Sequence, residues 1–203
     1  MSTLLQGALI GFAIAAPVGP IGLLVIRRTL ADGPVLGLAT GLGAAVADAA
    51  YGLVAVLGLG ALSAWLTGAM PALQLAGGAL LIWLGMSTLR AARRGRVAQA
   101  ASLDAASLGR AFASTCALTL ANPMTILSFA GLIAALGPGG FAGGFTLLLG
   151  VFVGSAGWWL VLVGATHAAR RALSAQAARM IEAASGVALI GFGLLALAAA
   201  ANQ

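Results

Sequence analysis

The stretch LLQGALIGFAIAAPVGPIGLLVI, residues 4–26, indicates how this chain folds. It carries no charged residue and is longer than the roughly 20 apolar residues that a helix needs to cross a bilayer. Its interior holds the helix-breaking run Pro17-Val18-Gly19-Pro20. An apolar run that continues past such a break predicts a membrane helix broken near its middle.

A cleaved signal peptide is the alternative for this stretch, because Ala13-Ile14-Ala15 is similar to a cleavage site. A signal peptide begins with a basic segment and ends soon after its apolar core. Here no Lys or Arg precedes the apolar run, and the run continues beyond Pro20. We therefore expect the stretch to be the first membrane span.

The composition of the whole chain also predicts a membrane environment. Of the 203 residues, 62% are hydrophobic and only 7% are charged, whereas a soluble domain has about 25% charged residues. The sequence predicts an all-α membrane protein with one transmembrane domain, residues 1–203. Its six expected spans are Leu4–Ile26, Val35–Gly60, Ala72–Leu89, Ala111–Leu136, Phe141–Thr166 and Met180–Ala201. The expected breaks between them include Gly68–Pro71.

The basic residues are all arginines, and they lie in or beside the connections after spans one, three and five. Those connections share one side of the membrane, and positive residues favour the cytoplasmic side. The sequence thus predicts cytoplasmic arginine loops and both termini on the periplasmic or extracellular side. The loop at about 90–110 is expected to contact membrane lipid. Nucleic acid is not an expected partner, because no aromatic residues are interleaved with the arginines.

The two halves of the chain are similar to one another. A shift of 107 residues aligns Gly43 with Gly150 and Asp48 with Ser155; shifts of 108 and 106 align residues 78–85 with 186–193 and Pro17 with Pro123. Each half has three spans, so the second would be inverted relative to the first. We expect two inverted three-helix repeats, about 1–90 and about 111–203, with broken helices one and four. Inverted repeats around a midplane site are common in secondary transporters.

The helix breaks predict where a substrate would bind. Pro17, Gly19 and Pro20 interrupt span one, and Asn122-Pro123 interrupts span four. The carbonyls freed by proline persist in a membrane only against other protein or a wet cavity. Half-helix ends can hold the charged groups of a small substrate. A proline kink that serves packing is the alternative. Val18 and Thr125 are further candidates to line the site.

Asp48 is the strongest single candidate for a functional role, because it lies near the middle of span two. An acidic residue at that depth costs several kcal/mol and is functional by default. It could act as a neutral donor or pair, when ionised, with a substrate ammonium, and switching between these states would couple proton and substrate movement. Tyr51, one turn away, and Ser155, its repeat equivalent, are expected near the site. A purely structural Asp48 bonded to a backbone carbonyl is the alternative.

Several classes of protein are excluded or disfavoured. The spacing Gly-x-Ser-x-Gly of a serine hydrolase is absent, so an enzyme is not expected. There is no metal-ligand cluster and no nucleotide-binding loop, and no metal or other cofactor is expected. Gly33, Gly37 and Gly41, like Gly150 and Gly154, have the spacing of close helix packing, either within the bundle or in a homodimer.

The sequence resembles those of the LysE/RhtB amino-acid exporters. The resemblance rests on Pro17-Val18-Gly19-Pro20, on Arg28 and the spaced glycines that lead to Asp48, and on Asn122-Pro123, and it covers nearly the whole chain. It implies export of amino acids across the bacterial inner membrane, driven by a proton or ion gradient. It also implies that Pro17, Gly19, Pro20, Asn122 and Pro123 form the translocation site. The family often has Lys after the Asn-Pro pair, where this chain has Met124, so lysine cannot be assumed as the substrate.

We therefore expect a secondary-active exporter of a small amino acid or a close derivative, with Asp48 as the residue for substrate binding and proton coupling. Alternating access would rock the two halves around a midplane site. The alternatives are a channel, a transporter of metal ions or other small solutes, and a non-transporting subunit of a membrane assembly.

Overall fold

The computed structural model describes residues 1–17, 19–56, 60–93, 105–122, 125–126, 128–129, 144–170 and 172–201. Every long element within these residues is an α-helix, which confirms the predicted all-α class. The helices are α1 (Thr3–Ala15), α2 (Pro20–Asp32), α3 (Pro34–Val56), α4 (Gly60–Arg93), α5 (Ala105–Leu120), α7 (Gly144–Arg170) and α8 (Ala175–Ala201).

The predicted break in the first span is present between α1 and α2. α1 ends at Ala15, α2 begins at Pro20, and the two helices meet at an angle of 83°. Gly19 is extended and serves as the N-cap of α2. The N–H that proline lacks would have no intrahelical acceptor at the first helical position, so Pro20 starts the new helix without losing a hydrogen bond. The break therefore places the C-terminal end of α1 and the N-terminal end of α2 near the middle of the molecule.

One predicted connection is shorter than expected, because only Gly33 separates α2 from α3, and the predicted break at Gly68–Pro71 is wrong. Arg27 and Arg28 belong to α2, which continues to Asp32 and stops only where Gly33 takes a positive φ of 98°. Gly68–Pro71 lies within the 34-residue helix α4, which accommodates Pro71 in its interior. Apolar runs underestimate helix length, because arginine is a good helix former and a helix can continue beyond the hydrocarbon layer.

Three described helices are long and apolar enough to cross a membrane: Pro34–Val54, Gly144–Arg170 and Arg179–Ala201. The bent pair α1–α2 counts as a fourth if it forms one broken span. α5 has 16 residues and leaves the helical conformation at Ala121, next to the predicted break at Asn122-Pro123. Pro123 and most of the rest of predicted span four lie outside the described residues. The described helices thus account for three or four of the six predicted spans.

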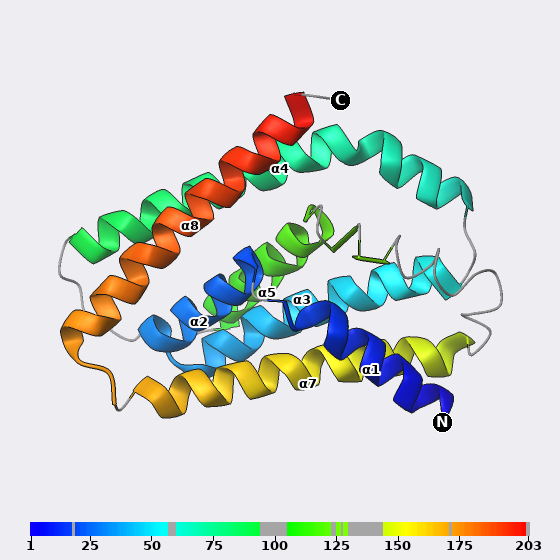
Figure 1. Cartoon of the computed structure of the whole chain (residues 1–203), viewed down its shortest axis with the longest axis horizontal. Coiled ribbons are helices and arrows are strands. Elements are labelled where there is room, and N and C mark those ends of the chain that lie inside the picture. The colour runs from blue at the N-terminus through cyan, green and yellow to red at the C-terminus, as the bar shows by residue number, and fades with distance from the viewer. Residues whose placement is uncertain are drawn as a thin grey trace.

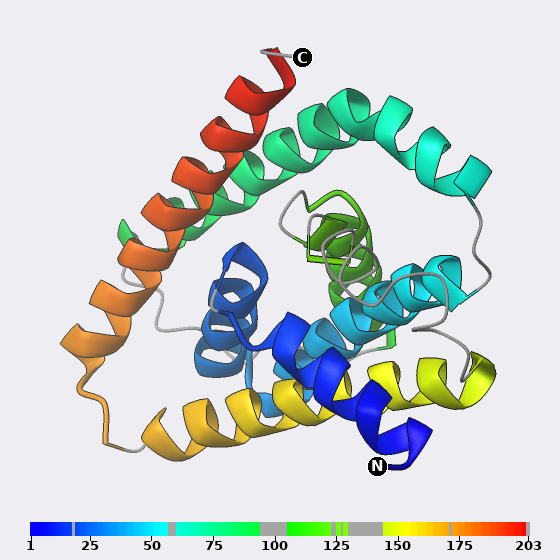
Figure 2. The same ribbon diagram turned by 45° about the vertical axis from the view of Figure 1, so that its right-hand side comes forward.

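The helices pack in pairs, of which α4–α8 and α3–α7 are antiparallel, whereas α1 runs in the same direction as α7 and α3 in the same direction as α5 (Figures 1 and 2). α4 and α8 lie side by side along the upper edge in Figure 1, α1 crosses α7 at the lower edge, and α3 packs between α5 and α7. Glycines permit the close approaches: a Cβ atom added to Gly78 would lie 2.8 Å from the carbonyl oxygen of Gly193. Small residues of this kind let helices associate in lipid through van der Waals contact.

The spaced glycines serve contacts within the chain at four of the five predicted positions. Gly37 and Gly41 face Val163 and Trp159 of α7, while Gly150 and Gly154 face α1. Gly33 does not take part, because it forms the turn between α2 and α3 and has no atom near its Cβ position. Its role is conformational, since a positive φ of this size is strained for any residue with a Cβ.

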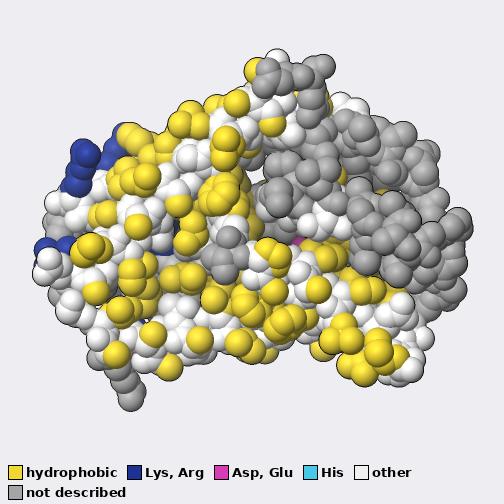
Figure 3. Space-filling view, viewed as in Figure 1, with side chains coloured by type: hydrophobic (Ala, Val, Ile, Leu, Met, Phe, Trp, Pro, Cys, Tyr) yellow, Lys and Arg dark blue, Asp and Glu magenta, His cyan; other side chains and the backbone are white. Residues whose placement is uncertain are grey.

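The surface of the described part is dominated by apolar side chains, and exposed leucines, valines and phenylalanines occur on α1, α3, α7 and α8 (Figure 3). A soluble monomer rarely exposes so large an apolar area, whereas lipid accepts it. The basic side chains in this view gather at the left end of the molecule. The C-terminal ends of α4 and α7 and the N-terminal end of α8 lie at that same end.

Candidate functional site

A cavity of about 250 Å³ lies where the break between α1 and α2 meets α3 and the end of α5. We call it the polar cavity, because hydroxyl, amide and carboxyl side chains make up part of its wall. The described residues that line it are Ile14, Ala15, Pro17, Gly19, Pro20, Ile21, Gly22, Asp48, Thr119, Asn122, Thr125, Ser128, Trp159 and Phe192. The cavity is thus built from the helix ends and from one buried acid.

Asp48 sits in the wall of the polar cavity, only 3% exposed, in the second half of α3. Ser155 of α7 donates a hydrogen bond of 2.6 Å to its Oδ2 atom, and the indole of Trp159 donates to the Ser155 hydroxyl at 3.2 Å. Among the described residues Asp48 makes no other hydrogen bond. The chain Trp159–Ser155–Asp48 fixes the carboxyl group and joins α3 to α7.

Thr119 adds an unsatisfied polar group to the same cavity. Its side chain is 3% exposed, and its Oγ1 atom has no hydrogen-bond partner within the described residues. A buried hydroxyl without a partner is unfavourable by about 1–3 kcal/mol. A polar solute or a water molecule bound in the cavity would remove that cost.

Tyr51 stabilises the end of α5 rather than lining the cavity. Its hydroxyl donates to the carbonyl of Leu120, the last residue of α5, and its ring stacks on Phe129 with centroids 5.4 Å apart. The last carbonyls of a helix lack intrahelical donors. The Tyr51 hydroxyl supplies the Leu120 carbonyl with a donor from across the interface. α3 thereby holds the end of α5 in place beside Asn122.

The structure brings together most of the residues that the sequence singled out. Pro17, Gly19, Pro20, Asp48, Asn122 and Thr125 line one cavity, and Ser155 contacts it through Asp48. Val18 and Pro123 lie outside the described residues. Sequence reasoning missed Thr119, Ser128, Trp159 and Phe192. Thr119 precedes Asn122 by almost one helical turn and could have been inferred, but Phe192 reaches the cavity only through the packing of α8.

Arg28 forms a second polar cluster that the sequence did not predict. Its Nη1 atom donates to Thr40 Oγ1, Thr115 Oγ1 and the carbonyl of Ala111, and its Nη2 atom donates to Ser114 Oγ, all at 3.1 Å. These bonds tie α2 to α3 and α5 at a point roughly two helical turns from the polar cavity along α2. The cluster joins, on the arginine-rich side, three of the helices that line the cavity.

These features define a helical membrane protein with a small cavity around a buried acid. The chain belongs to the LysE type translocator family, whose model matches residues 12–200. Members of this family transport small solutes and are not enzymes, which confirms both the resemblance and the expectation that the chain is not an enzyme.

Among curated proteins, the chain is similar to "Chemotactic transduction protein ChpE" of Pseudomonas aeruginosa. The two are 30% identical over 203 residues, which cover 97% of this chain and 98% of the relative. No solved structure matches the chain. The comparisons therefore establish a translocator of the membrane without naming its solute.

Proposed function

We propose that this protein is a secondary-active exporter of amino acids or close derivatives across the bacterial inner membrane. The observation that carries the proposal is the position of Asp48, a buried carboxyl group in a cavity made from helix breaks. The carboxylate of Asp48 suits an ammonium group, while the N-terminal end of α2 suits the carboxylate of the same amino acid. Alternate protonation of Asp48 would couple substrate movement to the proton gradient.

Paired contacts support an inverted-repeat architecture for this transporter. Gly41 packs against Trp159 and Gly52 against Leu148, and a shift of 107 residues converts the first contact into the second. On the other helix pair, Gly78 faces Gly193 and Gly85 faces Gly186, which a shift of 108 interconverts. A two-fold rotation produces self-complementary contacts of this kind.

The hydrogen bond between Asp48 and Ser155 lies at the centre of this relation. The two residues are 107 positions apart, so each is the equivalent of the other in the two halves, and the pair is its own equivalent. The pair thus lies where a two-fold axis between the halves would pass. Alternating access would rock the halves about this point, with three spans in each half, and would open the polar cavity first to one side and then to the other.

The charge distribution supports an orientation. The described arginines lie on the elements whose ends gather at one side of the molecule. The positive-inside rule assigns that side to the cytoplasm and both termini to the periplasm. Export would then begin from the arginine-rich side, where the Arg28 cluster joins α2, α3 and α5.

Flux into proteoliposomes under an imposed pH gradient tests the proposal. We expect the purified protein to move a labelled amino acid, and we expect Asp48→Asn to reduce gradient-driven flux to background. Asp32→Asn is the matched control, because Asp32 ends α2 and does not line the polar cavity. Unchanged, gradient-dependent flux in Asp48→Asn would overturn the coupling role.

The name of the Pseudomonas relative favours a second candidate, a membrane component of chemotactic transduction. Such a component would bind a solute without moving it. It predicts that amino acids raise the thermal stability of the protein while the proteoliposomes show no flux. A channel would be separated from both candidates by single-channel conductance, and a metal-ion transporter by flux of the ion.

A further inference from the structure

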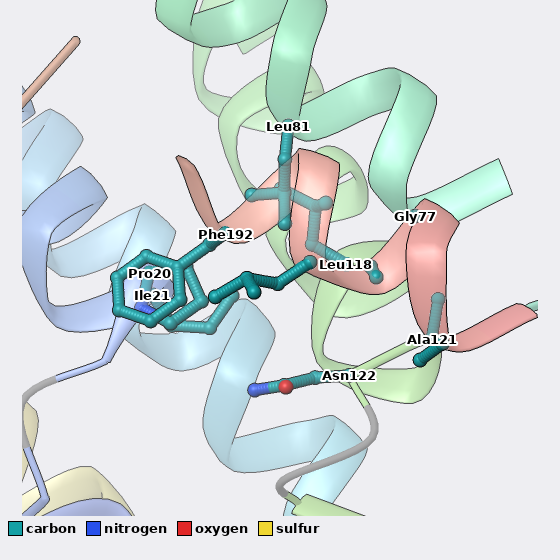
Figure 4. Close-up of a pocket in the computed structure, with 11 residues that line it drawn as sticks. Pro20, Ile21, Gly77, Leu81, Leu118, Ala121, Asn122 and Phe192 are labelled. Carbon is teal, nitrogen blue, oxygen red and sulfur yellow. The ribbon is translucent and has the colours of Figure 1, made fainter. Parts of the chain in front are cut away.

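A second cavity, of about 210 Å³, lies between α2, α4, α5 and α8 (Figure 4). Its described lining is apolar apart from Asn122, and most of it comes from Leu81, Leu118, Phe192, Leu195 and Ala196 together with smaller residues. We call it the apolar cavity. No acidic or basic side chain is present in this described lining.

The apolar cavity adjoins the polar one. Pro20, Ile21, Asn122 and Phe192 line both. In Figure 4 the side chain of Asn122, just beyond the end of α5, extends toward Pro20 and Ile21, below Phe192 and Leu118. A single small molecule that occupied both cavities would therefore place its polar atoms in the polar cavity and an apolar group in the apolar cavity.

The polar side of the wall is matched to the groups that all amino acids share. Asp48 Oδ1 can accept from an ammonium group, and Thr119 Oγ1 is buried without a partner. The helix that starts at Pro20 directs its N-terminal end at the cavity, where a carboxylate is favoured. These groups would hold the amino acid but would not distinguish one side chain from another.

From this juxtaposition of the two cavities we propose that the transported amino acids are zwitterions with an apolar side chain of leucine or methionine size. That side chain, branched or unbranched, lies in the apolar cavity. The inference rests on the proposed function. Placing a charged side chain there without a partner is strongly unfavourable, so lysine and glutamate are poor substrates. Small amino acids leave the apolar cavity empty and lose about tenfold or more per missing methylene.

Competition against labelled leucine in proteoliposomes tests the proposal. Wild-type protein is expected to accept leucine and methionine well, and alanine and lysine each at least about 100-fold more weakly. Ala196→Leu would fill the apolar cavity, because Ala196 is 7% exposed and lines it. That variant is expected to lower the leucine-to-alanine preference about tenfold. Ala198→Leu, at an exposed position on the same helix, is the matched control and keeps the wild-type preference.

The outcomes separate this inference from the proposed function. If no amino acid is moved or bound by wild-type protein, the exporter proposal fails. If amino acids are moved but lysine competes as well as leucine, or Ala196→Leu keeps the wild-type preference, the apolar substrate class is wrong while the exporter proposal stands. Should Ala196→Leu fail to fold, Phe192→Ala replaces it, since it enlarges both cavities and is expected to raise the acceptance of phenylalanine relative to leucine. An unchanged profile in Phe192→Ala overturns the inference.

Discussion

The contacts between α3 and α7 and between α4 and α8 join helices that are equivalent in the two proposed halves, yet they use different chemistry. α4 and α8 approach through Gly78, Gly85, Gly186 and Gly193. α3 and α7 also pack through glycines, with Gly41 against Trp159, but they add a buried polar chain of Asp48, Ser155 and Trp159. In lipid, close packing of small residues is enough to associate helices. A buried acid adds cost, so on the proposed function the α4–α8 contact serves stability and the α3–α7 contact serves transport.

The largest effect is expected when the glycine contact is broken. Alanine at position 193 would place its Cβ 2.7 Å from the carbonyl oxygen of Gly78, and neither backbone can move freely. Overpacking of this kind costs about 1–3 kcal/mol. We expect Gly193→Ala to lower the thermal stability of the protein in detergent while flux per folded molecule stays near wild type.

Gly191→Ala is the control for that change, because its Cβ would meet no atom within 4 Å. Alanine is favoured over glycine inside a helix, so this variant should be as stable as wild type or slightly more stable. Equal losses in Gly191→Ala and Gly193→Ala would show that the contact with α4 contributes nothing.

Removing Ser155 should have the opposite pattern, with a large effect on transport and a small one on stability. Ser155→Ala deletes the donor to Asp48 and frees the carboxyl group to move. A hydrogen bond between membrane helices contributes about 0.6 kcal/mol on average, so the loss of stability is expected to be small. The carboxyl group that is no longer held in place is expected to lower gradient-driven flux well below that of wild type. Ser87→Ala is the comparison, since the Ser87 hydroxyl bonds to Leu84 on its own helix. Normal flux in Ser155→Ala would mean that the carboxyl group needs no positioning.

The fold could be predicted from the sequence where it depends on composition and helix breakers. The break at Pro17–Pro20 and the helix end beside Asn122 follow from proline and from the absence of water in a bilayer. The helix ends could not be predicted in the same way. Arg27, Arg28 and Pro71 look like boundary residues, but all lie inside helices because backbone hydrogen bonding continues on both sides of them.

The candidate site was predictable to the extent that its residues are unusual for a membrane. Asp48 and the helix breaks are conspicuous in an apolar chain, and they do line one cavity. The Arg28 cluster and the contribution of Phe192 were not predictable, because both depend on which helices pack together. The similarity of the two halves pairs Asp48 with Ser155 in the sequence. Their hydrogen bond could not be inferred from it, because the bond depends on how α3 and α7 cross.

The smallest effect is expected at Tyr51, which supports the site from outside. Tyr51→Phe keeps the ring stacked on Phe129 and removes only the donor to the Leu120 carbonyl. Such bonds average about 0.6 kcal/mol in membrane proteins. We expect a small loss of thermal stability and a flux reduced less than in Ser155→Ala. A larger loss of flux than in Ser155→Ala would assign Tyr51 a direct role in transport.

The central claim is that the two halves share one acidic site on the axis between them, and an exchange of Asp48 and Ser155 tests it most directly. Asp48→Ser alone should abolish gradient-driven amino-acid flux in proteoliposomes. If the halves are equivalent, the double variant Asp48→Ser, Ser155→Asp restores the acid–hydroxyl pair from the opposite helix. We predict flux well above that of Asp48→Ser in a double variant that folds with wild-type stability. A folded double variant with no more flux than Asp48→Ser would contradict the account.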